Sequence, residues 1–278
     1  MKKERIITIL FIALLTMRFT IPFAYSQNNK FDQFNLPDYE KEAENFSYLL
    51  SIDNDPGKRK EYYYSRASAY YNMKKYSEAL DDINKAIEID PRDGRYYSLR
   101  GYCYNSMDMY QAAIISLTRA MEFGYVSYDN FYNRAQSYFR LGNYQKALAD
   151  VEQALKMNPD DHQSLYLRGS VYYMQSEPNK AINDLNRAIE IAPSDRLDRL
   201  YILRGASYIQ RSRFQQALAD INKAMEYNPA EASYLELRAE MYEFMERISL
   251  RRSVRDEYLR RARRDYAAAE DLRKVNME

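Results

Sequence analysis

Apolar positions in this chain recur at the spacing of amphipathic helices, most clearly over residues 128–161. Apolar residues at i, i+4 and i+7 share one face of a helix, and the first stripe consists of Phe131, Ala135 and Tyr138. After Gly142-Asn143 a second stripe follows, formed by Tyr144, Ala147, Val151 and Ala154. Asn158-Pro159 then stops the pattern. We therefore expect two short helices joined by a tight turn.

This hairpin pattern repeats along the chain. Equivalent large residues stand 34 apart at Tyr63, Tyr97, Phe131 and Leu165, and Tyr201 follows 36 later because of a two-residue insertion near Arg196-Leu197. One hairpin cannot bury its apolar face alone, so each unit must stack on its neighbours. The period predicts five full units, at 60–93, 94–127, 128–161, 162–195 and 198–231, and a sixth that begins at Ala232.

Two positions on the first helix of each unit carry the same kind of residue. A small residue stands at Ala67, Gly101, Ala135, Gly169, Gly205 and Ala239. Three positions later comes a tyrosine, at Tyr70, Tyr104, Tyr138, Tyr172, Tyr208 and Tyr242. With the alanines of the second helices, this pattern resembles the tetratricopeptide repeat family over residues 60–246. The resemblance implies an all-α fold, a right-handed α-solenoid of tetratricopeptide-type helix-turn-helix repeats.

The two ends of the chain depart from the repeat. Residues 1–26 are typical of a signal peptide, because Lys2, Lys3 and Arg5 precede the 12-residue apolar run Ile6–Met17, and small residues follow at Ala24 and Ser26. Cleavage before Gln27 would make the protein periplasmic or secreted, and an uncleaved anchor is the alternative. We expect a linker and a capping helix in 27–59, with the helix from about Asp38 to Ser51. Residues 60–246 then hold five full units plus the first helix of a sixth, and 247–278 form a basic C-terminal helix or cap.

An arginine precedes each small residue, and in four units an aspartate follows it 16 positions later. We expect each arginine to form a structural pair with the aspartate on the second helix of its own unit, through a bidentate, charge-assisted contact. The four predicted pairs are Arg66 with Asp82, Arg134 with Asp150, Arg168 with Asp184, and Arg204 with Asp220. In the second unit Ser116 replaces the aspartate.

The resemblance also implies a binding surface, because first helices line the concave face in that family. The residues expected on this face are Tyr64, Ser68, Tyr71, Tyr102, Asn105, Tyr132, Asn133, Gln136, Phe139, Tyr166 and Tyr173. This aromatic and amide-rich lining favours a noncatalytic scaffold that binds a peptide or a partner domain, since tyrosine offers rigid amphipathic area. A carbohydrate-binding accessory protein that stacks sugars on the same tyrosines is the alternative. About half of the tyrosines are expected to pack between units instead.

Little in the sequence supports catalysis. The single His162 and the single Cys103 leave little material for a metal site, a catalytic dyad or a disulfide. We interpret His162 as a solvated surface residue and Cys103 as a small core residue, and we expect no enzyme activity, metal or cofactor. A formal net charge of +1 gives no indication of nucleic-acid binding. Chaperone adaptors of the family clamp a terminal carboxylate, but Tyr64 and Ser68 stand where that clamp needs Lys and Asn.

One stretch is strongly basic. Residues 247–264 contain eight arginines against Asp256 and Glu257. An anionic partner, either a membrane surface met peripherally or an acidic protein, is one interpretation. Its candidate residues are Arg251, Arg252, Arg255, Arg260 and Arg264. The other interpretation is a solvated helix face with internal pairs such as Asp256–Arg260.

Overall fold

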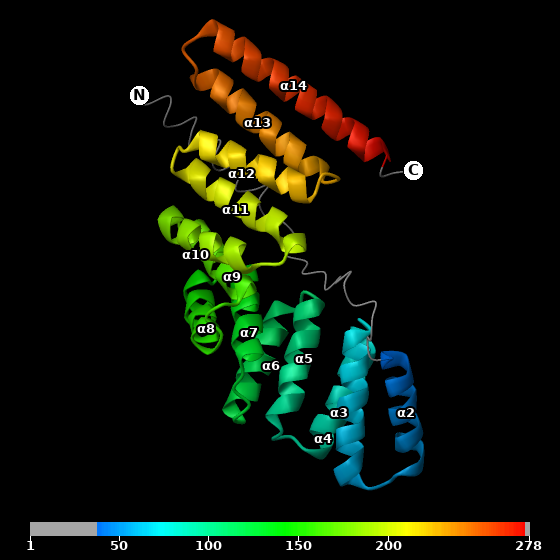
Figure 1. The fold of residues 1–278 in the computed structure, drawn as a ribbon. Helices are drawn as coiled ribbons and strands as arrows, with labels where there is room; N and C mark the ends of the chain where they lie inside the picture. The colour runs from blue at the N-terminus through cyan, green and yellow to red at the C-terminus, as the bar shows by residue number, and fades with distance from the viewer. Residues whose placement is uncertain (1–37, 276–278) are drawn as a thin grey trace. The chain divides into compact units, whose positions relative to one another are not determined.

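The computed structural model describes residues 38–275, which divide into two compact units, 38–159 and 160–275. Within these residues the regular structure consists of 13 α-helices and one 3₁₀ turn, without strands. The helices pack in consecutive pairs, which confirms the predicted all-α class (Figure 1). No described helix has the length and apolar character needed to cross a bilayer. The predicted signal peptide and residues 27–37 lie outside the described range.

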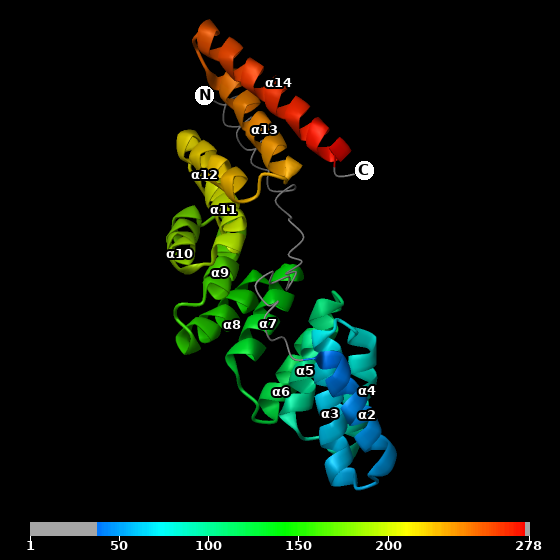
Figure 2. The same cartoon turned by 45° about the vertical axis from the view of Figure 1, so that its right-hand side comes forward.

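The 38–159 unit consists of one leading helix and three hairpins (Figures 1 and 2). Its helices are α2 (Tyr39–Ile52), α3 (Pro56–Asn72), α4 (Tyr76–Ile89), α5 (Gly94–Ser106), α6 (Tyr110–Glu122), α7 (Tyr128–Arg140) and α8 (Tyr144–Met157). The leading helix α2 packs against α3, so it covers the first full hairpin as a preceding second helix would. The first repeat begins earlier than its predicted start at residue 60, because Asp55 caps α3 and Pro56 occupies its first turn.

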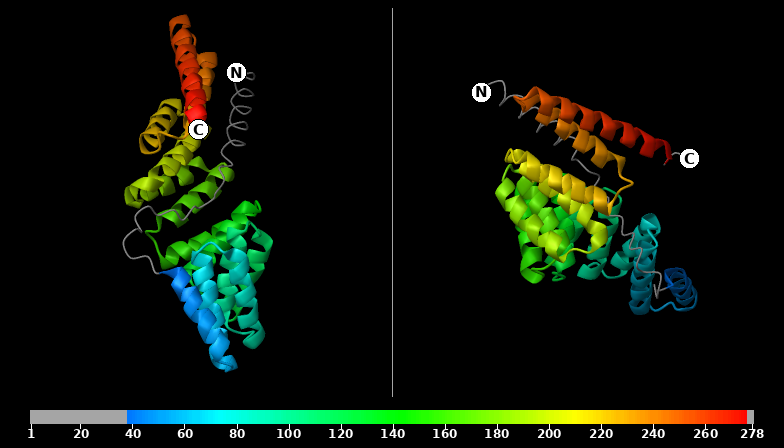
Figure 3. Two further views of the ribbon diagram at one scale, coloured as in Figure 1. Left: turned by 90° about the vertical axis from the view of Figure 1, so that its right-hand side faces the viewer. Right: turned by 45° about the horizontal axis from the view of Figure 1, so that its top comes forward.

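The 160–275 unit contains three hairpins. Its helices are α9 (His162–Met174), α10 (Pro178–Ile191), α11 (Leu197–Gln210), α12 (Phe214–Tyr227), α13 (Ala232–Ile248) and α14 (Arg252–Val275). The two inserted residues of this unit are absorbed in a 3₁₀ turn, Ser194–Arg196, directly before α11. In the last hairpin, α14 is the longest helix of the described chain and lies along α13 (Figure 3).

Five of the six first helices begin at a side chain that caps them, and α11 is the exception. Asp55, Asp93, Ser127 and Asp161 each accept a hydrogen bond from a backbone N–H in the first turn. Second helices follow a three-residue turn; α4, α6, α10 and α12 lack such a bond, whereas Asn143 caps α8. That turn has a left-handed residue at the same place in five hairpins: Lys74, Asp108, Gly142, Ser176 and Ser212. Only one of these is glycine, so four side chains occupy a conformation that costs L-residues energy.

The small residues of the first helices stand where two backbones approach. Ala67, Ala135 and Ala239 are fully buried. A Cβ atom added to Gly101 would lie 2.6 Å from Cγ of Leu117, closer than real contacts allow, whereas one added to Gly205 would meet its nearest atom at 3.4 Å. The interhelix space is therefore tightest in the second repeat.

Candidate functional site

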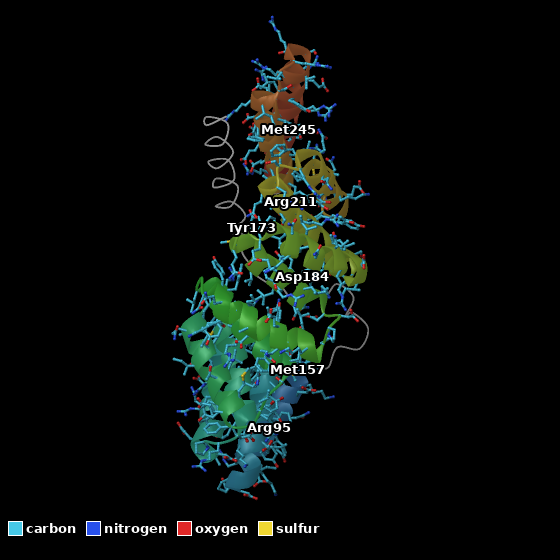
Figure 4. The ribbon with its side chains drawn as sticks, turned by 90° about the vertical axis from the view of Figure 1, so that its left-hand side faces the viewer. Arg95, Met157, Tyr173, Asp184, Arg211 and Met245 are labelled. Carbon is cyan, nitrogen blue, oxygen red and sulfur yellow. The ribbon has the colours of Figure 1, made fainter. Side chains whose placement is uncertain are left out.

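A guanidinium–carboxylate pair joins the two helices of a hairpin in five places. In each, the arginine donates from Nε to one carboxylate oxygen at 2.6–2.9 Å and from Nη2 to the other at 2.7–2.9 Å. The pairs are Arg66–Asp82, Arg134–Asp150, Arg168–Asp184, Arg204–Asp220 and Arg238–Asp265. The aspartates are buried, and Asp184 is labelled in Figure 4. Because the same arginine–aspartate pair recurs in five hairpins, we interpret these pairs as structural contacts rather than as a binding site.

The same arginines also reach the preceding hairpin. Nη1 of Arg134 donates to Oγ1 of Thr118 at 3.0 Å, and Nη1 of Arg204 donates to Oδ1 of Asn186 at 2.8 Å. Nη1 of Arg66 donates to Oγ of Ser47 on α2 at 2.8 Å. One guanidinium thus joins three helices, and α2 supplies the contact that a full preceding hairpin would supply.

Two arginines stand outside the four predicted pairs, and one of them, Arg238, has a carboxylate partner that was not predicted. Sequence reasoning assigned no partner to Arg238, because Asp265 lies 27 residues on, behind the extended α13 and its loop. The missed signal was the spacing within the second helix: Asp265 follows Ala262 by three, as Asp150 follows Ala147. In the second repeat Arg100 has no carboxylate partner within the described chain; its Nε donates to Oγ of Ser116 at 3.2 Å. Its guanidinium also lies over the ring of Tyr97, 4.7 Å from the centroid.

Three first helices of the 38–159 unit lie next to one another, since α5 contacts both α3 and α7. Their aromatic rings meet across the boundaries between repeats. The centroids of Tyr64 and Tyr96 are 5.4 Å apart, and those of Tyr71 and Tyr102 are 6.4 Å apart. Tyr64, Tyr71 and Tyr102 stay half-buried, and burial is the main cause that raises the pKa of each hydroxyl. These rings therefore pack between repeats and still keep an accessible edge.

Amide side chains between α5 and α7 form a hydrogen-bond network. Nδ2 of Asn105 donates to the backbone oxygen of Asn133 at 2.8 Å and to Oε1 of Gln136 at 3.3 Å. Oγ of Ser137 donates to Oδ1 of Asn105 at 2.6 Å. Nearby, the Tyr102 hydroxyl donates to Oδ1 of Asn130 at 2.8 Å. The network holds the half-buried side chains of Asn133 and Gln136 in fixed orientations.

The structure does not expose every residue that the sequence places on the binding face. Asn105 and Tyr132 are buried, and Tyr132 stacks on Tyr128 with centroids 6.1 Å apart. Tyr173, labelled in Figure 4, is also buried in the 160–275 unit. Asn105 bonds to α7 across a repeat boundary, and the burial of Tyr132 and Tyr173 leaves little of these two side chains for a ligand to contact. Tyr166 is half-buried on α9 and belongs to the 160–275 unit.

We name the remaining accessible side chains on α3, α5 and α7 the first-helix surface. It consists of Tyr64, Ser68, Tyr71, Tyr102, Asn133, Gln136 and Phe139, all half-buried. Amide groups and tyrosine hydroxyls supply both donors and acceptors, and aromatic rings supply apolar area. Such a surface can recognise a chain molecule whose polar backbone and side chains alternate.

The two single residues with reactive groups lie in the packed interior or at its edge. Cys103 is fully buried, as predicted, and burial raises the pKa of its thiol to about 12, so it stays protonated. His162 is half-buried rather than solvated, and its Nε2 has no hydrogen-bond partner in the described chain. Desolvation lowers its pKa, which keeps the imidazole neutral. Within residues 38–275 no group of three or more His, Cys, Asp or Glu could hold a metal ion.

The basic C-terminal stretch splits into paired and unpaired arginines. Arg255 pairs with Glu246 at 3.1 Å, and Arg260 pairs with Glu257 at 2.8 Å rather than with the expected Asp256. Arg264 lies 3.9 Å from Asp265. Arg251 and Arg252 are exposed and form no ion pair with any described residue. Ion pairs therefore neutralise only part of the positive charge of residues 247–264.

Antiparallel helix pairs on a 34-residue period, with one small residue at each close approach, define a helical repeat protein. Family models described as tetratricopeptide repeat match residues 61–93, 132–196 and 198–231. The chain therefore contains tetratricopeptide repeats over these residues. Proteins of this family are generally noncatalytic scaffolds for protein–protein interaction. No curated protein matches the sequence.

Solved structures share the fold at low sequence identity. The chain is similar to YrrB, described as a tetratricopeptide repeat protein with an unusual peptide-binding site, at 21% identity and a TM-score of 0.59, covering 70% of this chain and 98% of YrrB. It is similar to the C-terminal part of a tetratricopeptide repeat-containing protein from Cytophaga hutchinsonii, at 20% identity and a TM-score of 0.61, covering 84% and 91%. At these identities the likeness shows the fold.

Proposed function

We propose that the protein is a scaffold that binds an extended peptide segment of a partner protein on the first-helix surface. The observation that carries this proposal is the oriented amide of Gln136. Its Oε1 accepts from Asn105, and its Nε2 has no hydrogen-bond partner within the described residues. A half-exposed donor held in place can meet a peptide carbonyl without losing much side-chain entropy.

The surroundings of Gln136 fit a peptide. Asn133 lies one turn before it on α7, and its side chain is also fixed, by a bond from its Nδ2 to the backbone oxygen of Asp129 at 2.9 Å. Tyr102 and Phe139 add aromatic area beside these amides, so polar and apolar contacts alternate along the surface. The likeness of the fold to YrrB supports a peptide as the ligand class.

The carbohydrate alternative needs open faces of tyrosine rings. Several ring faces are already covered: Tyr132 is buried against Tyr128, and the rings of Tyr64 and Tyr71 contact the next repeat. We therefore favour a peptide. A panel of oligosaccharides that quenched the tyrosine fluorescence of the protein in a saturable manner would support the alternative.

The test uses random dodecapeptides displayed on phage, selected on the immobilised protein, and then synthesised with a fluorescent label. We expect Gln136→Ala and Asn133→Ala each to weaken binding of a selected peptide by roughly 3–10-fold, the loss of about one hydrogen bond. Fluorescence anisotropy measures the dissociation constants, and circular dichroism melts verify that the variants stay folded.

Gln153→Ala is the matched control, because Gln153 is an exposed amide on α8, a second helix of the same unit. Its dissociation constant should equal that of the unmodified protein. Equal losses in Gln153→Ala and Gln136→Ala, or no enriched peptide at all, would contradict the proposal. Tyr132 is unsuitable for this test, because its burial makes any substitution a test of folding.

A further inference from the structure

The loop between α13 and α14 carries two exposed apolar side chains. Leu250 is 100% exposed and Ile248 is 43% exposed. Ile248 ends α13 and Arg252 begins α14, so both apolar side chains stand at the tip of a helical hairpin. A single exposed leucine is ordinary on a protein surface, and the charges around this one give it meaning.

Unpaired positive charge gathers at the same tip. Arg247, Arg251 and Arg252 are exposed and form no ion pair with any residue of the described range. Farther along α14, Arg260 and Arg261 share Glu257. Arg264 lies 3.9 Å from Asp265, and among the described residues Arg263 has no ion-pair partner. The nearest acidic side chain before the tip, Glu246, is already engaged by Arg255 at 3.1 Å. Apolar surface and uncompensated cations therefore coincide in residues 247–252, which we name the basic tip.

The basic tip stands on a rigid base. Met241, Phe244 and Met245 of α13 are buried, and Met245 marks this helix in Figure 4. The rings of Tyr242 and Tyr258 stack between α13 and α14 with centroids 6.0 Å apart. Packing below the tip thus fixes the hairpin without using Leu250, and substitutions at Leu250 should leave the fold intact.

We propose that the basic tip docks on the surface of an anionic lipid bilayer, with Leu250 and Ile248 entering the interface and the arginines contacting lipid phosphates. Arginine side chains bind phosphate through charge-assisted hydrogen bonds and keep their apolar stems near the acyl boundary. Anionic lipid attracts such clusters, and inserted apolar side chains strengthen the contact. A projecting apolar tip suits a deformable interface, whereas an acidic protein surface would need charge alone.

Tryptophan reports this contact locally, because the chain contains none. In full-length Leu250→Trp, vesicles of equal phosphatidylglycerol and phosphatidylcholine should shift the emission to the blue, and brominated lipid should quench it. Full-length Val275→Trp is the control: Val275 is 69% exposed at the far end of α14, about 35 Å along the helix from Arg252. Its emission should not change, and pure phosphatidylcholine vesicles should affect neither variant.

The contribution of the arginine charges to lipid binding is measured in the same Leu250→Trp variant. Each arginine near an anionic surface strengthens binding about fivefold, so adding Arg251→Gln and Arg252→Gln to Leu250→Trp should raise the lipid concentration for half-maximal shift about 25-fold. Adding Arg273→Gln and Lys274→Gln to Leu250→Trp instead removes the same amount of charge far from the tip. This change should alter the lipid concentration for half-maximal shift by less than twofold.

Three results would overturn the inference: no shift of Leu250→Trp on anionic vesicles, the same shift for Val275→Trp, or equal losses from the two double substitutions. Sedimentation of the protein with anionic vesicles that Leu250→Ser leaves unchanged would also overturn it, because another part of the chain would then be responsible. These outcomes are separate from the peptide test, which uses variants of α7.

Discussion

Two neighbouring hairpins of the 38–159 unit, α5–α6 and α7–α8, have the same plan but join their helices by different contacts. In α7–α8, Arg134 and Asp150 form a bidentate pair whose side chains are only 16% and 9% exposed. In α5–α6, Arg100 meets Ser116 through one bond of 3.2 Å, and the helices instead approach so closely that Gly101 has no room for a Cβ atom. One hairpin relies on charge and the other on close packing.

The comparison shows that one repeat can exchange a polar contact for a steric one. Burial acts to lower the pKa of Arg134, and the hydrogen bonds and charge of Asp150 together raise it above the ordinary arginine value. A buried guanidinium therefore depends on its carboxylate. Arg100 has no carboxylate partner among the described residues; its Nε donates to Ser116 and its guanidinium lies over the ring of Tyr97. The repeat without the aspartate should thus tolerate polar substitutions and resist added volume.

The largest expected difference comes from removing the carboxylate. Asp150→Ala leaves Arg134 largely buried and unpaired and should lower the free energy of unfolding by about 3 kcal/mol. Ser116→Ala removes one weak bond and should cost about 1 kcal/mol or less. Urea unfolding followed by circular dichroism measures both.

Double-mutant cycles sharpen this prediction. The coupling between Arg134→Ala and Asp150→Ala should exceed about 1 kcal/mol, and the coupling between Arg100→Ala and Ser116→Ala should be below about 0.5 kcal/mol. Ser116→Asp is the reciprocal change and should increase the coupling with Arg100. Equal coupling in the two hairpins would show that the carboxylate contributes nothing specific.

The next effect in size is steric. Gly101→Ala places a methyl group 2.6 Å from Leu117 and should destabilise the protein by about 1–3 kcal/mol. Gly205→Ala is the matched control, since its added Cβ would meet ordinary contacts at 3.4 Å, and helix propensity should make it neutral or stabilising by up to about 1 kcal/mol. Thermal melts of the two variants should therefore shift in opposite directions or differ by several degrees.

The sequence predicted these hairpins well and the exposure of the first-helix residues only in part. Period and small residues predicted the helices, and the 16-residue spacing predicted four ion pairs, because both follow from contacts repeated in every unit. Asp265 was missed because the extended α13 breaks that spacing. The burial of Asn105 was also missed, because it depends on which side chains of α5 and α7 meet across a repeat boundary. The period also did not indicate which tyrosines, such as Tyr132, would be buried. Periodicity indicates a helix face but does not state how closely the next helix covers it.

The smallest expected effect lies in the turns of the same two hairpins. Gly142 has φ of +73° in the α7–α8 turn, with no atom within 4 Å of an added Cβ, so Gly142→Ala tests backbone strain alone and should cost about 1 kcal/mol. Asp108 has φ of 58° in the α5–α6 turn and already bears that strain. Asp108→Gly should gain less, about 0.5 kcal/mol, because aspartate tolerates this conformation and its carboxylate accepts a bond from the Tyr110 hydroxyl. The urea midpoint should fall in Gly142→Ala and rise by a smaller amount in Asp108→Gly. Shifts of equal size and opposite sign would mean that the two turns carry the same strain, and the hairpins would then differ only in their interhelix contacts.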